Sequence, residues 1–164
     1  MTNFGVILAG LLGGGLAGAI VSIIVSTVQR QRRRLAYWAA LDVEVDLCAG
    51  FARVYTSQDA PASPLYRLST IAYESAFPAL LGDGVTSRED TRCLLRFYGQ
   101  VVQINRGLDH IQAALSGPHD AAPSVVNEIS RVRLKATALV DPNCTDDGGP
   151  YLSSVRAAIK RHLH

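Results

Sequence analysis

Residues 4–28 read FGVILAGLLGGGLAGAIVSIIVSTV, a run of 25 residues without one charged side chain. Arg30, Arg32, Arg33 and Arg34 follow this run at once. At about 1.5 Å per residue, a helix over this run is roughly 37 Å long, enough to cross a hydrocarbon core about 30 Å thick. The sequence therefore predicts a transmembrane helix over residues 4–28, inside an N-terminal anchor of residues 1–34.

Two other interpretations of the run are weaker. A cleaved signal peptide needs basic residues ahead of an apolar stretch of about 7–15 residues. Here Met1, Thr2 and Asn3 carry no side-chain charge, the run is longer, and the arginines come after it. A buried core helix rarely lacks charge over such a length. An uncleaved single-pass anchor is therefore favoured.

The four arginines also predict the orientation of the anchor. Lys and Arg near the ends of a span are retained in the cytoplasm, and here they lie only on the C-terminal side. We expect a bacterial inner-membrane protein with its N-terminus outside and residues 35–164 in the cytoplasm. The arginines are also suited to bind anionic lipid headgroups. Such basic runs are common beside membrane anchors, which disfavours a nucleic-acid site here.

Small residues recur every fourth position along the predicted span. This stripe consists of Gly10, Gly14, Gly18, Ser22 and Ser26. Helices in lipid associate mainly where small residues let their backbones approach closely. The stripe, a glycine zipper, therefore predicts a homo-oligomer. A glycine-rich anchor that stays monomeric is the alternative, and the sequence does not decide whether an oligomer would enclose a pore.

The composition of residues 35–164 suits one helical domain. Without the four juxtamembrane arginines, the 16 Lys+Arg fall to 12 against 14 Asp+Glu, so this part is nearly neutral. That balance argues against a dedicated nucleic-acid surface. Its three cysteines are far apart and form no C-x-x-C pair, which predicts free thiols.

Apolar residues in residues 35–164 recur at alternating gaps of three and four, the spacing of a buried helix face. Four such seams are present: Trp38, Leu41, Val45, Cys48, Ala52 and Tyr55; Leu94, Phe97, Val101, Ile104, Leu108, Ile111 and Leu115; Val125, Ile129, Val132, Ala136 and Leu139; Leu152, Val155 and Ile159. The predicted fold class is all-α: one N-terminal transmembrane helix followed by a cytoplasmic helical bundle of about four main helices.

Several polar and helix-breaking residues refine this expectation. Ser87 and Asp90 have the spacing of a capping box, with Asp in place of Glu or Gln, at the start of the longest seam. Between Tyr66 and Gly84, Pro78 limits any helix to a short piece. Asn105, beside the long seam, is expected to make an interhelical hydrogen bond. The acidic residues Asp42, Glu44 and Asp46 are expected to form a solvated flank of the Trp38 seam.

One catalytic motif has to be weighed. Arg156 and His162 form an R-x5-H arrangement that resembles the motif of HEPN ribonucleases, which are helical bundles. That resemblance implies an Arg that stabilises phosphate charge and a His that transfers protons. However, Ala157 stands where a polar residue usually follows the Arg. Six residues also turn a regular helix through about 600°, so the two side chains would not share a face.

Other signatures of chemistry are missing from the sequence. The loop 141–150 (DPNCTDDGGP) carries acids, but Asp146 stands where an EF-hand needs Gly and Leu152 where it needs Glu. The chain has no phosphate-binding loop, G-x-S-x-G or H-E-x-x-H. We therefore predict a protein that is not an enzyme, without a metal or cofactor.

The chain also resembles a loose class of small bacterial and phage single-pass membrane proteins with an N-terminal anchor and a cytoplasmic helical domain. The resemblance covers residues 1–115 and depends on three motifs: LDVEVDL at residues 41–47, Tyr73-Glu74-Ser75, and F-Y-x-x-V-x-x-I-N at residues 97–105. Some similar proteins accompany CRISPR or other antiphage systems and perturb the inner membrane. The resemblance implies a membrane-perturbing defence effector or accessory.

Together these features predict a protein that self-associates through its glycine-rich membrane face. Its cytoplasmic domain is expected to bind a protein or small-molecule signal, and its other partners to be membrane lipid and further copies of itself. Two alternatives stay open. One is a membrane-tethered HEPN-like ribonuclease that uses Arg156 and His162, and the other is a structural scaffold or phage accessory anchor.

Overall fold

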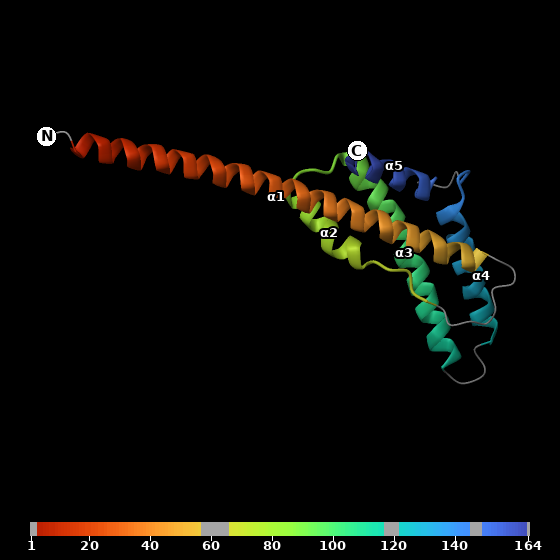
Figure 1. The fold of residues 1–164 in the computed structure, drawn as a ribbon. Helices are drawn as coiled ribbons and strands as arrows, with labels where there is room; N and C mark the ends of the chain where they lie inside the picture. The colour runs from red at the N-terminus through yellow and green to blue at the C-terminus, as the bar shows by residue number, and fades with distance from the viewer. Residues whose placement is uncertain (1–2, 57–65, 117–121, 145–148, 164) are drawn as a thin grey trace. The chain divides into compact units, whose positions relative to one another are not determined.

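The computed structural model describes residues 3–56, 66–116, 122–144 and 149–163, with the side chains of 3–17 and 122–124 left undescribed. These residues form five α-helices and no strand (Figure 1). The helices are α1 (Asn3–Thr56), α2 (Ile71–Gly82), α3 (Arg88–Leu115), α4 (Ala122–Val140) and α5 (Tyr151–Leu163). The all-α prediction is therefore confirmed.

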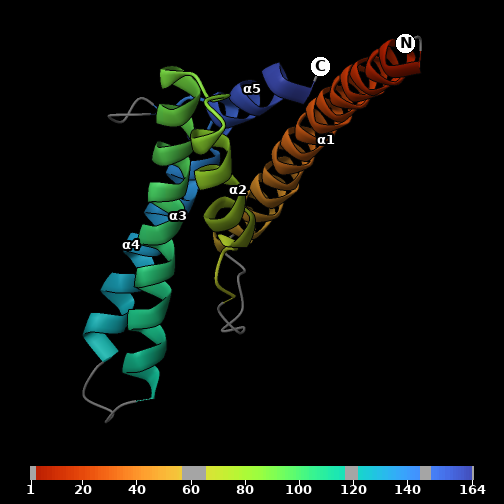
Figure 2. The same cartoon turned by 90° about the vertical axis from the view of Figure 1, so that its left-hand side faces the viewer.

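The chain divides into two compact units, Met1–Ala36 and Tyr37–His164. The division falls inside α1, so the first unit holds the N-terminal part of that helix and the second unit holds its C-terminal part. Within the second unit α3 packs against α4 and α5, and Figure 2 shows α4 running beside α3. The second unit is a helical bundle, as the seams predict.

The core of the bundle is built from the predicted seams. Its fully buried side chains include Leu41 and Val45 of α1, Leu94 and Phe97 of α3, and Ile159 of α5. Two expectations were wrong: Leu115 is 68% exposed and Ile129 is 41% exposed. Leu115 is the last residue of α3 and Ile129 lies in the N-terminal half of α4. The seam spacing therefore continued past the part of each helix that is covered.

Local sequence explains where α2 and α3 end and begin. The α2 helix runs four residues beyond Pro78, which lies inside it, and stops at Gly82. Gly84 then adopts φ +64°, a left-handed conformation that glycine reaches without steric cost. The predicted capping box is confirmed: the Ser87 side chain accepts from the Asp90 amide at 3.0 Å, and Asp90 accepts from the Ser87 amide at 3.2 Å.

One glycine sets the closeness of α3 and α4. A Cβ added at Gly107 would lie 2.4 Å from Cγ2 of Val132. Real Cβ atoms do not approach carbon so closely, so the two helices pack at a distance that only glycine allows at this position.

Candidate functional site

Two helices of the bundle meet at Asp90, a buried carboxylate in the first turn of α3. Besides the capping box, Asp90 receives two groups from the last turn of α5. Arg161 forms an ion pair with Oδ1, and Nε2 of His162 lies 3.0 Å from Oδ2. The Ser87 hydroxyl donates to Oδ2 at 2.7 Å. We call Ser87, Asp90, Arg161, His162 and Trp38 the Asp90 cluster.

Trp38 of α1 completes the Asp90 cluster. Its ring stacks on the His162 imidazole with the centroids 4.2 Å apart and the planes 4° from parallel. Trp38 is buried, and the His162 side chain is 24% exposed. The cluster therefore joins α1, α3 and α5 at one end of the bundle.

The charge state of Asp90 follows from these contacts. Burial alone raises the pKa of a carboxyl group, because it disfavours the charged form. Here the hydrogen bonds from Arg161, Ser87 and His162 outweigh burial and lower the pKa of Asp90 to about 2. Asp90 is therefore ionised at neutral pH, which suits a structural anion rather than a group that exchanges protons near pH 7.

The two residues of the R-x5-H motif engage different carboxylates. Arg156 forms an ion pair with the exposed Asp46 of α1, whereas His162 contacts Asp90. His162 also has one ring face covered by Trp38. The described contacts give Arg156 and His162 no shared partner. The ribonuclease interpretation of this pair stays a prediction.

A second buried carboxylate, Glu44 of α1, lies at the start of α2. It is 4% exposed and accepts four hydrogen bonds. Oε1 accepts from the Ser69 hydroxyl at 2.7 Å and the Ala72 amide at 2.8 Å. Oε2 accepts from the Tyr73 amide at 2.8 Å and the Tyr98 hydroxyl at 2.9 Å. The expectation of a solvated Glu44 was therefore wrong.

Glu44 replaces a missing local cap. Thr70 is the N-cap residue of α2 but makes no side-chain cap hydrogen bond, and the Ala72 and Tyr73 amides in the first turn of the helix donate instead to Glu44 of α1. A negative charge at a helix N-terminus is also favoured by the helix dipole. Burial, with the charge and the hydrogen bond of Glu44, raises the pKa of Tyr98. Burial and the charge of Glu44 raise the pKa of Cys48 to about 12.

The segment before α2 has a second polar attachment, at Asn105 of α3. Its Oδ1 accepts from the Leu68 amide and its Nδ2 donates to the Leu68 carbonyl, both at 2.8 Å. The expected hydrogen bond of Asn105 therefore exists, but its partner is the backbone of the segment before α2 rather than another helix. Glu44 and Asn105 together fix residues 68–73 to the bundle.

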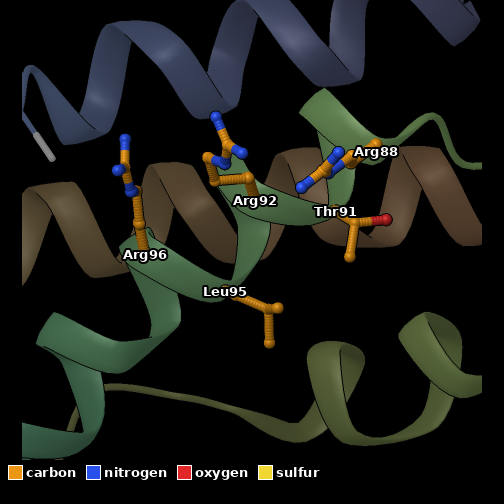
Figure 3. A pocket seen from close by; sticks show the side chains of 5 residues that line it. All are labelled: Arg88, Thr91, Arg92, Leu95 and Arg96. Carbon is orange, nitrogen blue, oxygen red and sulfur yellow. The ribbon is translucent and has the colours of Figure 1, made fainter.

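An open concavity of about 360 Å³ lies on the outer face of α3 (Figure 3). It is lined by Arg88, Thr91, Arg92, Leu95 and Arg96, which we call the basic face. In Figure 3, Arg92 and Arg96 extend to one side of α3, while Thr91 and Leu95 point to the other side. Like charges four residues apart repel one another and destabilise a helix slightly. The basic face is suited to an anion.

The sequence patterns considered above predicted neither the basic face nor the contacts of Glu44. The spacing of Arg88, Arg92 and Arg96 was available as a signal, because residues four apart share a helix face. Glu44 gave no such signal, because its partners come from residues 69–98.

The predicted membrane residues are only partly described. Gly10 and Gly14 lie outside the residues whose side chains are described, while Gly18, Ser22 and Ser26 are exposed residues of α1. An added Cβ at Gly18 would meet no atom within 4 Å. Arg30, Arg32 and Arg33 are exposed and Arg34 is half-buried.

Among the residues whose side chains the structure describes, which in α1 begin at Gly18, no helix is both long enough and apolar enough to span a bilayer.

The remaining candidate groups are reactive or metal-binding side chains. Cys48, Cys93 and Cys144 are free thiols. Burial raises the pKa of the Cys93 thiol, and the charge of Glu89 adds to this effect. Among the described residues no group of three His, Cys, Asp or Glu side chains is placed to hold a metal ion. Asp146 and Asp147 of the acidic loop lie outside the described residues.

Comparisons with protein-family models, with curated proteins and with solved structures find no match to this chain.

Proposed function

We propose that this chain is a single-pass inner-membrane protein. In this proposal residues 4–28 span the membrane, the N-terminus is outside, and the helical bundle lies in the cytoplasm. The uncharged run of 25 residues followed by Arg30, Arg32, Arg33 and Arg34 carries the proposal. The continuous α-helix from Asn3 supports it, because a spanning segment must satisfy all its backbone hydrogen bonds internally.

The proposed activity is association and binding rather than catalysis. The stripe of Gly10, Gly14, Gly18, Ser22 and Ser26 brings copies together in the membrane. The bundle binds a signal, and the basic face of α3 favours one that carries negative charge. By resemblance, the protein acts as a membrane-perturbing defence effector or accessory. In that role, overexpression admits a membrane-impermeant dye, and Gly14→Leu with Gly18→Leu reduces the uptake.

Thiol labelling in intact cells tests the topology. A membrane-impermeant maleimide should leave Cys93 and Cys144 unlabelled until the inner membrane is permeabilised, while a cysteine placed at Thr2 should be labelled from outside. Labelling of Cys93 or Cys144 in intact cells, or recovery of the full chain in the fraction that alkaline carbonate extracts from membranes, contradicts the proposal.

Association through the stripe is tested in a membrane dimerisation assay on the full chain. Gly14→Leu with Gly18→Leu should weaken the signal several-fold, because leucine separates the two backbones. Leu11→Ala with Leu12→Ala is the matched control off the stripe. Equal signals from the two variants would remove the stripe from the proposal.

A further inference from the structure

The part of α1 in the second unit carries apolar residues on two faces. The inner face holds Leu41, Val45, Cys48 and Ala52, all fully buried. The outer face holds a second apolar set with gaps of three, four, three and four, which we call the outer seam: Ala40, Val43, Leu47, Gly50 and Val54. A helix at a bundle surface normally carries polar residues on its outer face.

The outer seam is exposed to solvent within the chain. Val43 is 61% exposed, Leu47 is 51% exposed and Val54 is 55% exposed. A Cβ added at Gly50 would meet no atom within 4 Å, so packing inside the chain does not require glycine there. A contiguous exposed apolar patch of this kind marks an interaction surface.

The spacing of the outer seam specifies a helix as the occupant. Apolar residues that alternate by three and four repeat every 3.5 residues, the period that keeps one helix in contact with another along a coiled coil. A helix with the same period interlocks with this seam over its whole length. A second copy of α1 has that period.

The charges beside the outer seam also fit a second copy. At about 100° per residue, Asp42, Asp46 and Arg53 fall within roughly 40° of one another, on one flank. The fourth charged residue of this segment, Glu44, is buried in the bundle. In a parallel pair related by a two-fold axis, the charged flank of each helix lies beside the uncharged flank of the other, which holds Phe51. Like charges are therefore kept apart.

We propose that the outer seam is the bundle's homodimer interface, in which the α1 helices of two copies pack in parallel between Ala40 and Val54. The parallel direction rests on the proposed function, because two anchors in one membrane enter the cytoplasm from the same side. Gly50 then allows a close approach of the two backbones.

Disulfide crosslinking of the full chain in native membranes tests this interface. Val43→Cys and Leu47→Cys are made singly in a background of Cys93→Ser and Cys144→Ser, with the buried Cys48 retained. Leu134→Cys on α4, where the native leucine is 72% exposed, is the control. Under copper-catalysed oxidation the two seam variants should form several-fold more dimer than the control, because identical seam positions face each other across a parallel pair.

Two results would overturn the proposal. One is dimer at Val43→Cys and Leu47→Cys no greater than at Leu134→Cys. The other is crosslinking of Ala40→Cys with Val54→Cys, expressed together in the same cells, without self-crosslinking of either variant or of Val43→Cys, which would indicate an antiparallel pair. Leu47→Glu should abolish the dimer at Val43→Cys, whereas Leu134→Glu should leave it unchanged.

A separate arm distinguishes this inference from the proposed function. The dimerisation assay on the full chain carrying Leu47→Glu reports the stripe without the seam. If the seam variants crosslink while this assay shows no dependence on Gly14 and Gly18, the seam interface is supported and association through the stripe is contradicted. If the seam variants do not crosslink while the assay depends on Gly14 and Gly18, the seam interface is contradicted and association through the stripe is supported.

Discussion

At the scale of single residues, two buried carboxylates connect the helices of the bundle. Glu44 is the acceptor for donors from α2, α3 and the segment between α1 and α2, and Asp90 joins α3 to α5. Each is fully supplied with donors, and no buried side-chain nitrogen or oxygen of the described residues lacks a partner. Removal of such a buried anion is costly, because its hydrogen-bond donors are then left buried without an acceptor.

Glu44→Ala should destabilise the bundle by roughly 3 kcal/mol or more, because a buried tyrosine hydroxyl and two helix amides lose their acceptor. Asp42→Ala, two residues earlier on the same helix, should change stability by less than about 0.5 kcal/mol. Denaturation of the full chain in detergent, followed by fluorescence of the single Trp38, measures both. Equal effects would mean that the Glu44 contacts contribute little.

Asp90 predicts a pH dependence of stability. Its pKa is lowered to about 2 in the folded chain, against about 4 when unfolded. Its contribution is therefore present above pH 4, amounts to about 2 kcal/mol, and is lost as the pH falls toward 2. Asp90→Asn should accordingly be less stable than wild type at pH 6 and nearly equal to it close to pH 2.

Asp109→Asn is the control for Asp90→Asn. Asp109 pairs with Arg67 at 3.3 Å, but both side chains are well exposed, so its loss should cost less than about 1 kcal/mol at any pH. If Asp90→Asn and Asp109→Asn gave the same pH profile, the Asp90 cluster would not stabilise the bundle through its charge.

At the scale of elements, the contact of α3 with α4 depends on Gly107. Gly107→Ala should destabilise the bundle by about 1–3 kcal/mol, because its Cβ would overlap the β-branched Val132, which has little freedom to turn away. Gly99→Ala lies on the same helix with no atom within 4 Å of the added Cβ. It should stabilise by about 0.5–1 kcal/mol through helix propensity. Thermal unfolding of both variants checks the opposite signs.

The sequence predicted the helices better than the polar contacts between them. Spacing alone located the buried faces around Leu41, Leu94 and Ile159, because a helix repeats its environment every 3.6 residues. It also located the capping box, whose two residues are three apart. It misplaced Glu44, because the donors that make its burial favourable are up to 54 residues away. The Asp90–His162 contact, 72 residues apart, was missed for the same reason.

At the scale of the whole molecule, the second unit presents two surfaces of different chemistry: the apolar outer seam of α1 and the basic face of α3. In our proposals the first binds a copy of the chain and the second binds an anion. Separate surfaces allow association and ligand binding to be changed independently by mutation.

The basic face predicts binding of a polyanion. Arg92→Glu with Arg96→Glu should weaken binding of inorganic polyphosphate to the full chain by at least tenfold, because two attractive charges become repulsive. Arg131→Glu with Arg133→Glu makes the same charge change on α4 and should have a small effect. Titration calorimetry in detergent at low salt measures both. A comparable loss in the control would mean that overall charge, not this face, governs binding.

The cap that Glu44 provides has a consequence for biosynthesis. The Ala72 and Tyr73 amides at the start of α2 donate to Glu44 of α1, and Glu44 also accepts from the Tyr98 hydroxyl. Residues 66–86 therefore depend on α1 and α3 for the contacts that stabilise their helix. We expect this stretch to remain unfolded as it leaves the ribosome. It should form a helix only after α3 has been synthesised and has packed against the same Glu44 carboxylate.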